Sequence, residues 1–396
     1  MNEQHYIVNG FKAGAVNAGL KKGNGADLAL IFSERPAVAA GAFTTNRVKA
    51  APVLLSMKHI ARGRARAVVA NAGNANACTG SRGLNDAAKT ASETARMLKV
   101  DKAEVLVAST GVIGARLNME AISAAIPDLA RAISKKGIPE AARAIMTTDS
   151  FPKMSVFDGH AGGVPYRILG LAKGAGMIMP HMATMLCFIL SDVMIDAAQL
   201  DRVLKECVEQ TFNRITVDGD TSTNDMVVMM ANGGAGNDPL TSQDAEEFRG
   251  GLTHVTGDLA RMIVKDGEGA TKLVEIRVKN AQSPQDASQG ARTVANSSLV
   301  KTALYGQDPN WGRIMAALGR ADIEMIESKV DIWIDEVQIV SGGQGVGVEA
   351  EKRAAEIMEG PEFAVTIDLH EGAHHDHILT CDLTHDYVSI NADYRS

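Results

Sequence analysis

The amino-acid sequence predicts a mixed α/β protein with much antiparallel sheet, because strand-like and helix-like segments alternate along all 396 residues. Short apolar runs that end in glycine-rich or polar turns are typical of buried strands. Runs with an apolar residue every three or four positions indicate helices that pack one face on a sheet. The composition, with 45% hydrophobic and 22% charged residues, is that of a folded protein with an ample core.

The expected elements follow in chain order. Strands are expected at 27–33 (DLALIFS), 66–73 (RAVVANAG), 103–110 (AEVLVAST), 185–190 (MLCFIL), 329–340 (KVDIWIDEVQIV) and 362–369 (EFAVTIDL). Helices are expected at 84–100, 195–212 and 242–264, the last with a glycine pair inside it. Neither an internal repeat nor a proline-rich linker divides the sequence.

The charge of the chain is distributed unevenly. The net charge of −7 argues against nucleic acid as a partner. Residues 1–183 hold 23 Lys and Arg against 12 Asp and Glu, a balance of +11, whereas residues 184–396 hold 17 against 35, a balance of −18. Opposite charges suit two pieces of a chain that stay associated, although chance imbalance on solvated surfaces produces the same pattern.

Targeting signals are not recognised in the sequence. The N-terminus lacks a basic start followed by an apolar run, so no signal peptide is predicted. No segment approaches the roughly 20 apolar residues that span a bilayer. The four cysteines are scattered without a CxxC pair, as in proteins that keep their thiols reduced. We therefore expect a cytoplasmic protein without membrane contact.

The most unusual segment is 173–192, KGAGMIMPHMATMLCFILSD. A glycine-rich, proline-interrupted loop leads to Ala183, and Thr184 precedes the apolar run. The Thr184 hydroxyl can attack the preceding carbonyl, and water can cleave the resulting ester, which breaks the chain between these residues. The new N-terminal threonine owns an α-amine with a pKa of about 7.7–8.0, which can accept the hydroxyl proton. Ordinary β-propensity also places threonine at the start of strands.

Eight motifs that follow one another across the chain resemble the ornithine acetyltransferase family, the glutamate N-acetyltransferases of arginine biosynthesis. They are NAGNANACTG (71–80), ASTGVIG (108–114), MTTDS (146–150), KGAGMIMPHMATML (173–186), VDGDTSTND (217–225), KDGEGATK (265–272), DPNWGRI (308–314) and INADYRS (390–396). The resemblance implies a four-layer αββα sandwich of the self-processing N-terminal-nucleophile-like acyltransferase type, with mixed, largely antiparallel sheets. It also implies fragments 1–183 and 184–396 that pack as one catalytic unit, with two copies of each in the assembly.

The same resemblance implies the reaction. The family cleaves itself before the threonine of its ATML motif, here Thr184, which takes an acetyl group from N2-acetylornithine and passes it to glutamate. The products are ornithine and N-acetylglutamate. The oxyanion hole corresponds to Thr110 and Gly111, and a hydroxyl with a backbone N–H suits a tetrahedral oxyanion. Enzymes that use only N-acetylornithine and bifunctional enzymes that also use acetyl-CoA share these motifs. The motifs therefore do not distinguish between the two kinds of acetyl donor.

The family's substrate-binding pattern matches six residues: Thr147, Lys173, Thr184, Glu268, Asn391 and Ser396. A lysine supplies a cation for the α-carboxylate, a glutamate an anion for an amino group, and the remaining groups complete the hydrogen bonds. Two positions depart from the family. His181 stands where the family has asparagine, and Ser396 replaces a threonine, a change that keeps a hydroxyl.

Two other function classes compete with the acetyltransferase. One is an N-terminal-nucleophile amidase or aminopeptidase, in which water discharges the acyl-enzyme. The other is a binding protein without activity, or a zinc protease suggested by HEGAH (370–374), which matches HExxH. That motif needs a helix, whereas the alternating apolar residues before it and Gly372 within it favour a strand and a turn. We therefore predict no metal site and no bound cofactor.

Overall fold

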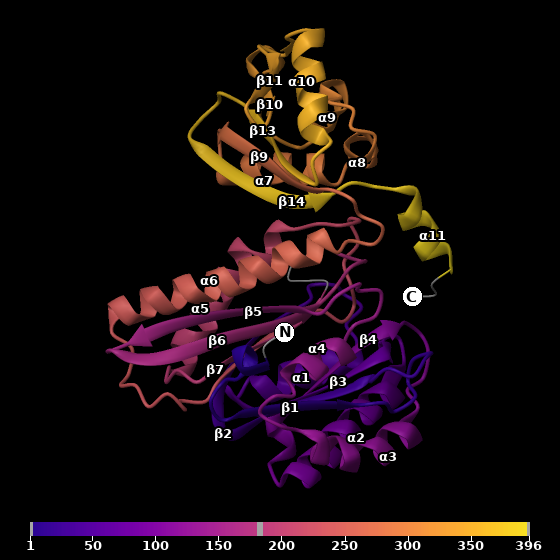
Figure 1. Cartoon of the computed structure of the whole chain (residues 1–396), viewed down its shortest axis with the longest axis vertical. Coiled ribbons are helices and arrows are strands. Elements are labelled where there is room, and N and C mark those ends of the chain that lie inside the picture. The colour runs from indigo at the N-terminus through magenta and orange to yellow at the C-terminus, as the bar shows by residue number, and fades with distance from the viewer. Residues whose placement is uncertain (1–2, 180–184, 394–396) are drawn as a thin grey trace. The chain divides into compact units, whose positions relative to one another are not determined.

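The computed structural model describes residues 3–179 and 185–393, and the chain divides into two compact units (Figure 1). Unit 1 runs to Asn213 and takes in Asp220–Ile263, while unit 2 consists of Arg214–Gly219 and the described chain from Val264 to Asp393. The predicted fragment boundary at Ala183 and Thr184 lies outside the described residues. Strands from both sides of it belong to unit 1, so the fragments 1–183 and 184–396 are not the compact units and stay a prediction.

Unit 1 is built on an eight-stranded sheet in the order β4-β3-β2-β8-β7-β6-β5, with β1 paired to β2 beside this path. Its strands are β1 (Phe11–Val16), β2 (Leu28–Phe43), β3 (Arg64–Asn74), β4 (Val105–Val112), β5 (Lys153–Ala161), β6 (Val164–Lys173), β7 (Leu186–Ser191) and β8 (Met226–Ala231). Its helices are α1 (Ala51–Ile60), α2 (Gly80–Leu98), α3 (Met119–Ala132), α4 (Ile138–Ala144), α5 (Ala197–Gln210) and α6 (Ser242–Lys265), whose last two residues fall in unit 2.

The long strand β2 bends the sheet of unit 1. Its register with β3 shifts between Phe32 and Ala37, and Pro36 lies in this break. The first half of β2 pairs with β3 and the second half with β8. Residues from both parts of the sheet therefore share one apolar cluster with α4, including Val68, Ala70, Leu106, Ile138, Leu169, Leu171, Phe188 and Leu190. Each large side chain buried in this way contributes roughly 1.5–3 kcal/mol, so the cluster holds the bend.

Helix α6 runs without a break through the glycine pair expected inside it, which confirms the prediction of a helix at 242–264. Gly251 faces β5, because a Cβ atom there would lie 2.3 Å from the Phe157 ring. Gly170 of β6 faces α6 in turn, since a Cβ atom there would lie 2.7 Å from the side chains of Val255 and Leu259. These missing side chains let helix and sheet approach closely, at the usual conformational cost of glycine.

Unit 2 contains a six-stranded sheet in the order β12-β11-β10-β13-β9-β14, in which only β13 and β9 pair in parallel. Its strands are β9 (Leu273–Ala281), β10 (Asp331–Ile334), β11 (Val337–Ser341), β12 (Gln344–Gly345), β13 (Glu362–Asp368) and β14 (His374–Cys381). Its helices are α7 (Pro284–Ala295), α8 (Ser298–Tyr305), α9 (Trp311–Gly319), α10 (Val348–Met358) and α11 (His385–Asp393). Short 3-10 turns cover Glu3–Tyr6, Lys102–Glu104, Phe212–Arg214 and Glu327–Lys329.

The predicted mixed α/β class with largely antiparallel sheets is confirmed. One strand prediction is wrong. The range 329–340 contains not one strand but most of the hairpin β10–β11, which turns at Asp335 and Glu336, with Ile334 opposite Val337. The alternation of apolar residues continues through this two-residue turn and so hides it, whereas Asp335 adopts a left-handed φ of 46° that a continuous strand does not contain.

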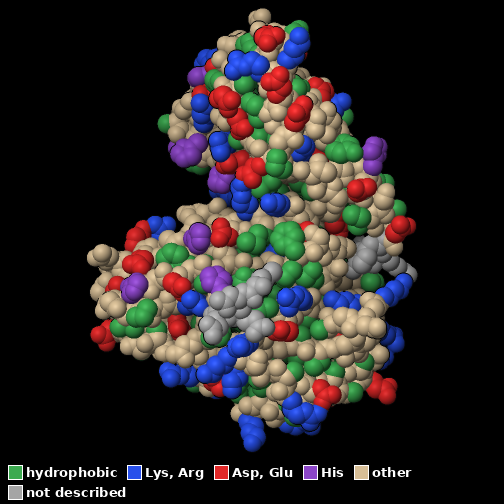
Figure 2. Space-filling model, viewed as in Figure 1, with side chains coloured by type: hydrophobic (Ala, Val, Ile, Leu, Met, Phe, Trp, Pro, Cys, Tyr) green, Lys and Arg blue, Asp and Glu red, His purple; other side chains and the backbone are tan. Residues whose placement is uncertain are grey.

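Two surface properties bear on partners. Among the described residues, no helix combines the length and hydrophobicity that crossing a bilayer requires. Clusters of Lys and Arg side chains occupy the lowest part of the face in Figure 2, which is the part of unit 1 drawn in indigo and violet in Figure 1. This agrees with the positive balance of residues 1–183.

Candidate active site

Three predicted site residues of unit 1 meet at Lys173, the last residue of β6. Its ammonium donates to the hydroxyl of Thr147 at 2.7 Å and to the hydroxyl of Thr110 at 3.3 Å. Thr110 lies in β4, five positions from β6 in the strand order, and Thr147 follows α4. A flat sheet would keep strands so far apart in the order separated, so the curvature of the sheet brings these residues together. The Lys173 side chain is 9% exposed, which means that this cation is held by its partners rather than by bulk water.

A fully buried ion pair lies next to Lys173. Asp149 Oδ1 is 2.7 Å from Lys153 Nζ, and neither side chain is exposed, while Oδ2 is 3.9 Å from Lys173 Nζ. The carboxylate also accepts from the N–H groups of Gly174 at 2.7 Å and Thr147 at 3.0 Å. Burial acts to raise the pKa of Asp149, but the charges of both lysines and these hydrogen bonds prevail and lower it to about 2.

Asp149 is expected to stabilise the folded protein through this lowered pKa. Because the pKa falls from an ordinary 3.8 to about 2, the contribution is complete above pH 3.8 and is lost as the pH falls through 2. We predict that Asp149→Asn lowers the free energy of unfolding at pH 7 by about 2–4 kcal/mol, since it leaves Lys153 buried without its counter-ion. Urea unfolding measures this change.

The matched control is Asp128→Asn, which removes the carboxylate of an exposed pair with Arg131. Exposed pairs contribute little, so this variant is expected to unfold almost like the wild type. Equal, small losses in both variants would contradict the structural role of Asp149.

The backbone at Gly111 allows only glycine. Its φ is +125°, and a Cβ atom there would lie 2.3 Å from the carbonyl carbon of Gly73 on β3. The two glycines are partners in the parallel β3–β4 ladder, which shifts register between Gly73 and Asn74. The predicted oxyanion pair of Thr110 and Gly111 therefore sits where two strand ends come into direct backbone contact.

Asparagine side chains hold this strand end in place. Asn224, from the motif VDGDTSTND, donates to the carbonyls of Ala75 at 2.7 Å and Ser109 at 2.9 Å. The Ser109 hydroxyl in turn donates to Asn71 at 2.6 Å. These buried bonds link three of the motifs that the sequence singled out, and they fix the backbone at Ser109, directly before Thr110.

The chain on both sides of 180–184 is anchored at the same end of the sheet. Thr221 donates to the carbonyl of Met179 at 3.0 Å, and the N–H of Met226 donates to the carbonyl of Met185 at 2.9 Å. Leu186, the first residue of β7, lies opposite Lys173 in the β6–β7 ladder.

The residues that the prediction assigns to cleavage, Ala183 and Thr184, lie outside the described residues, as does His181. Met185, the described residue next to Thr184, directly precedes Leu186, the β7 residue that pairs with Lys173. The ladder brings the start of β7 to the end of β6 that carries the lysine.

Unit 2 brings its own two predicted residues together. Asn391 of α11 donates to the Glu268 carboxylate at 2.8 Å. Glu268 is buried in the loop after α6. The next residue, Gly269, has a φ of +69°, and a Cβ atom on it would lie 2.7 Å from the backbone nitrogen of Tyr387. The hydroxyl of Thr384 donates to the Gly269 carbonyl at 2.8 Å and closes this contact. Ser396 lies outside the described residues.

Two sequence motifs have structural roles. HEGAH is not helical: its first four residues lie in the turn between β13 and β14, and His374 begins β14. His370 interacts with Asp331 and Asp368. Within the described part of the chain, no group of three His, Cys, Asp or Glu side chains is placed to hold a metal ion. In DPNWGRI, Asn310 caps α9 and Trp311 donates to Glu351 at 3.0 Å.

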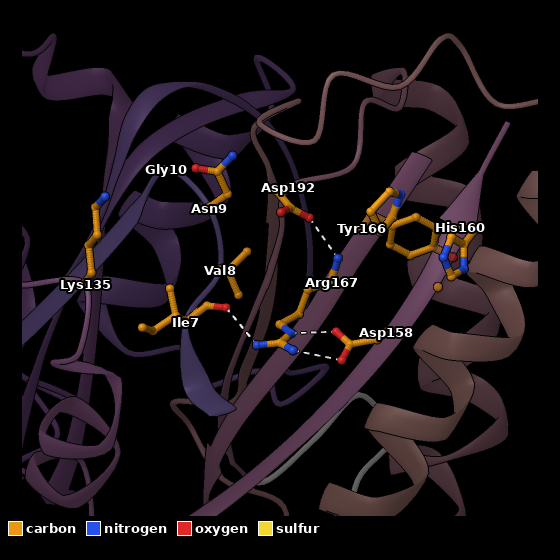
Figure 3. Close-up of a pocket in the computed structure, with 12 residues that line it drawn as sticks. Ile7, Val8, Asn9, Gly10, Lys135, Asp158, His160, Tyr166, Arg167 and Asp192 are labelled. Carbon is orange, nitrogen blue, oxygen red and sulfur yellow. Dashed lines mark hydrogen bonds and ion pairs between the residues drawn. The ribbon is translucent and has the colours of Figure 1, made fainter. Parts of the chain in front are cut away.

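A cavity of about 550 Å³ lies at the other end of the β5–β6 hairpin, away from Lys173 (Figure 3). Arg167 stands at its centre, paired with Asp158 at 2.6 Å and hydrogen-bonded to the carbonyl of Ile7, while its N–H donates to Asp192. None of the predicted site residues within 3–179 and 185–393 lines this cavity. Arg167 is held by Asp158 and Asp192 within the protein, so we do not assign the reaction to this cavity.

The comparisons with known proteins agree with the motifs. The ArgJ family matches residues 12–396. The Arginine biosynthesis bifunctional protein ArgJ of Geobacter sulfurreducens is 52% identical over 391 residues, which cover 98% of this chain and 100% of that protein. The protein of the same name from Desulfotalea psychrophila is 49% identical over the same coverage.

A solved structure supports the same assignment. A chain of the Arginine biosynthesis bifunctional protein ArgJ of Bacillus halodurans is 43% identical and superposes with a TM-score of 0.50, over 52% of this chain and 98% of that chain. The family resemblance inferred from the motifs is thereby confirmed. The chain belongs to the ArgJ family.

Proposed function

We propose that the protein transfers the acetyl group of N2-acetylornithine to glutamate through an acetyl-Thr184 intermediate, after cleavage between Ala183 and Thr184. The observation that carries the proposal is the cluster of Lys173, Thr110 and Thr147, which lies where β7, the strand that follows Thr184, begins. As a member of the ArgJ family, the chain is an acetyltransferase of arginine biosynthesis.

Cleavage precedes transfer in this proposal. The Thr184 hydroxyl adds to the Ala183 carbonyl, the C–N bond breaks, and the acyl group moves from nitrogen to oxygen. Water then hydrolyses the ester, which leaves a carboxylate on Ala183 and a free α-amine on Thr184. The Bacillus halodurans chain supports such a division, because 98% of its length corresponds to only 52% of this chain. The proposed fragment 184–396 has 213 of the 396 residues, a similar share.

The α-amine then acts as the base for transfer. It takes the hydroxyl proton as Thr184 Oγ attacks the acetyl carbonyl of N2-acetylornithine, and returns it to the departing nitrogen of ornithine. The amino group of glutamate next attacks the acetyl-threonine ester. N-acetylglutamate leaves, and the Thr184 hydroxyl is restored.

Both tetrahedral intermediates need a donor for their oxyanion. Lys173 donates to the Thr110 oxygen, so the Thr110 hydroxyl proton is directed away from the lysine and is available to the oxyanion. The nearby ammonium charge strengthens that donor. The Gly111 N–H, set by a backbone that only glycine adopts, is the proposed second donor.

Substrate recognition is assigned to two groups of residues. Lys173 and Thr147 bind the α-carboxylate, and the Glu268 carboxylate, oriented by Asn391, binds an amino group. The hydroxyls of Thr184 and Ser396 complete the set. The proposal retains acetyl-CoA as a second donor, as the word bifunctional in the names of the relatives suggests. We also propose an assembly of two copies of each fragment. A cytoplasmic location is in keeping with the four free cysteines.

Release of ornithine from N2-acetylornithine, measured with and without glutamate, tests the proposal. A transferase requires the acceptor for repeated turnover, so ornithine release is expected to depend on glutamate and to yield equal N-acetylglutamate. Release that is indifferent to glutamate would instead identify the amidase. Replacing the donor by acetyl-CoA in the same assay decides whether the enzyme is bifunctional.

A further inference from the structure

We infer that Lys21 binds the side-chain carboxylate of the acceptor amino acid, an inference that rests on the proposed transfer to glutamate. Lys21 lies in the loop between β1 and β2 and belongs to none of the motifs that carry the family resemblance. Its position next to the Lys173 cluster follows only from the fold.

The loop that carries Lys21 is held rigidly by one buried carboxylate. Asp27, which is fully buried, accepts from the N–H groups of Ala18 at 2.7 Å, Leu20 at 2.5 Å and Lys21 at 3.1 Å. The loop also packs on Gly73 of β3, where a Cβ atom would lie 2.5 Å from the Leu20 carbonyl oxygen. This is the same glycine that contacts Gly111, so the loop is fixed against the oxyanion strands.

The Lys21 ammonium points at the segment that carries Thr147. It donates to the carbonyl of Met146 at 3.1 Å and to that of Ala144 at 3.4 Å. Met146 precedes Thr147, whose hydroxyl accepts from Lys173, so two ammonium groups flank one short stretch of backbone. Toward the described residues Lys21 uses two of its three N–H donors, and the third is available for a ligand.

The charges around Lys21 favour an anion. The pKa of Lys21 lies below its usual value, chiefly because of burial and also because of the nearby Lys173 charge, although Asp27 and Asp149 act in the opposite direction. Asp27 is occupied by the N–H groups of the loop, and Asp149 is shared between Lys153 and Lys173. Among the described residues, Lys21, Lys153 and Lys173 therefore lie near two carboxylates, and this local positive charge suits a substrate that brings a further carboxylate group.

The two proposed substrates differ in the group that Lys21 would meet. Glutamate carries a second carboxylate on its side chain, whereas N2-acetylornithine carries an ammonium group there, for which Glu268 is proposed. Lys173 is engaged with two hydroxyls and Asp149 and is assigned to the substrate α-carboxylate, so the side-chain carboxylate of glutamate needs a second cation. Lys21 therefore acts on the acceptor half of the reaction and leaves the donor half almost untouched.

Ping-pong kinetics separate these halves, because kcat/KM for each substrate reports its own half-reaction. We predict that Lys21→Met lowers kcat/KM for glutamate about 10- to 100-fold and changes that for N2-acetylornithine less than about threefold. Lys21→Arg keeps the charge and is expected to retain most of the glutamate value. Lys21→Gln keeps a donor toward Met146 without the charge, so it is expected to resemble Lys21→Met.

The matched control is Lys22→Met, which removes the charge of the neighbouring, exposed lysine and is expected to change neither value. Equal losses for both substrates in Lys21→Met and Lys21→Gln would show that Lys21 only supports the 144–147 segment and would overturn the inference. Unchanged kinetics in a folded variant would overturn it as well. A wild-type protein that releases no ornithine at all would instead refute the proposed function, so the two failures are distinguishable.

Discussion

Replacing Thr184 with alanine is expected to leave one uncleaved chain that transfers no acetyl group. The hydroxyl is the nucleophile of both reactions in our account, and nothing else in the described cluster replaces it, since Lys173 is engaged with Thr110, Thr147 and Asp149. Loss of a covalent nucleophile lowers turnover by roughly 10⁴-fold or more. Electrophoresis of the purified protein and an ornithine-release assay measure the two effects.

Thr184→Ser is the matched control for this prediction. Serine keeps the hydroxyl and loses only a methyl group, so cleavage and some transfer are expected to persist. A Thr184→Ala protein that still yields fragments 1–183 and 184–396 would contradict the proposed nucleophile.

Replacing Thr110 with alanine is expected to lower kcat by roughly 10²–10³-fold with little change in KM. The hydroxyl acts on the negative charge that develops in the transition state, so its loss affects the chemical step more than substrate binding. Self-cleavage is expected to slow less, because that attack occurs at a differently placed carbonyl. Steady-state kinetics with N2-acetylornithine and glutamate provide the measurement.

Thr110→Ser keeps a hydroxyl next to Lys173 and is expected to retain most of the activity. Melting temperatures of the same preparations guard against a purely structural effect, since Thr110 is a strand residue whose replacement also changes packing. A folded Thr110→Ala protein with normal kcat would rule out the oxyanion role.

The local patterns of the sequence predicted much of the fold. The runs 27–33, 66–73, 103–110, 185–190 and 362–369 fall in β2, β3, β4, β7 and β13, because each is a short apolar run bounded by turn residues. The hairpin at Asp335 was missed, since a two-residue turn preserves the alternation of its flanking strands. The bend of β2 was also missed, because it depends on the pairing of one long strand with two different strands, β3 and β8, which are distant in the sequence.

The candidate site was only partly visible in the sequence. Thr110, Thr147 and Lys173 were found through motifs, but their contact depends on the bent sheet, which no local pattern encodes. Asp149 stands inside MTTDS, yet its burial with Lys153 could not be foreseen, because charged residues are usually exposed. Lys21 gave no signal at all, since only tertiary packing brings its loop to the segment before Thr147.

The intact mass of the two fragments after mixing with N2-acetylornithine in the absence of glutamate tests the central claim most directly. The fragment beginning at Thr184 is expected to gain the mass of one acetyl group, peptide mapping is expected to place that group on Thr184, and added glutamate is expected to remove it. An acetyl group on another residue, for example Cys187, or no acetylated fragment in an active preparation, would contradict the account.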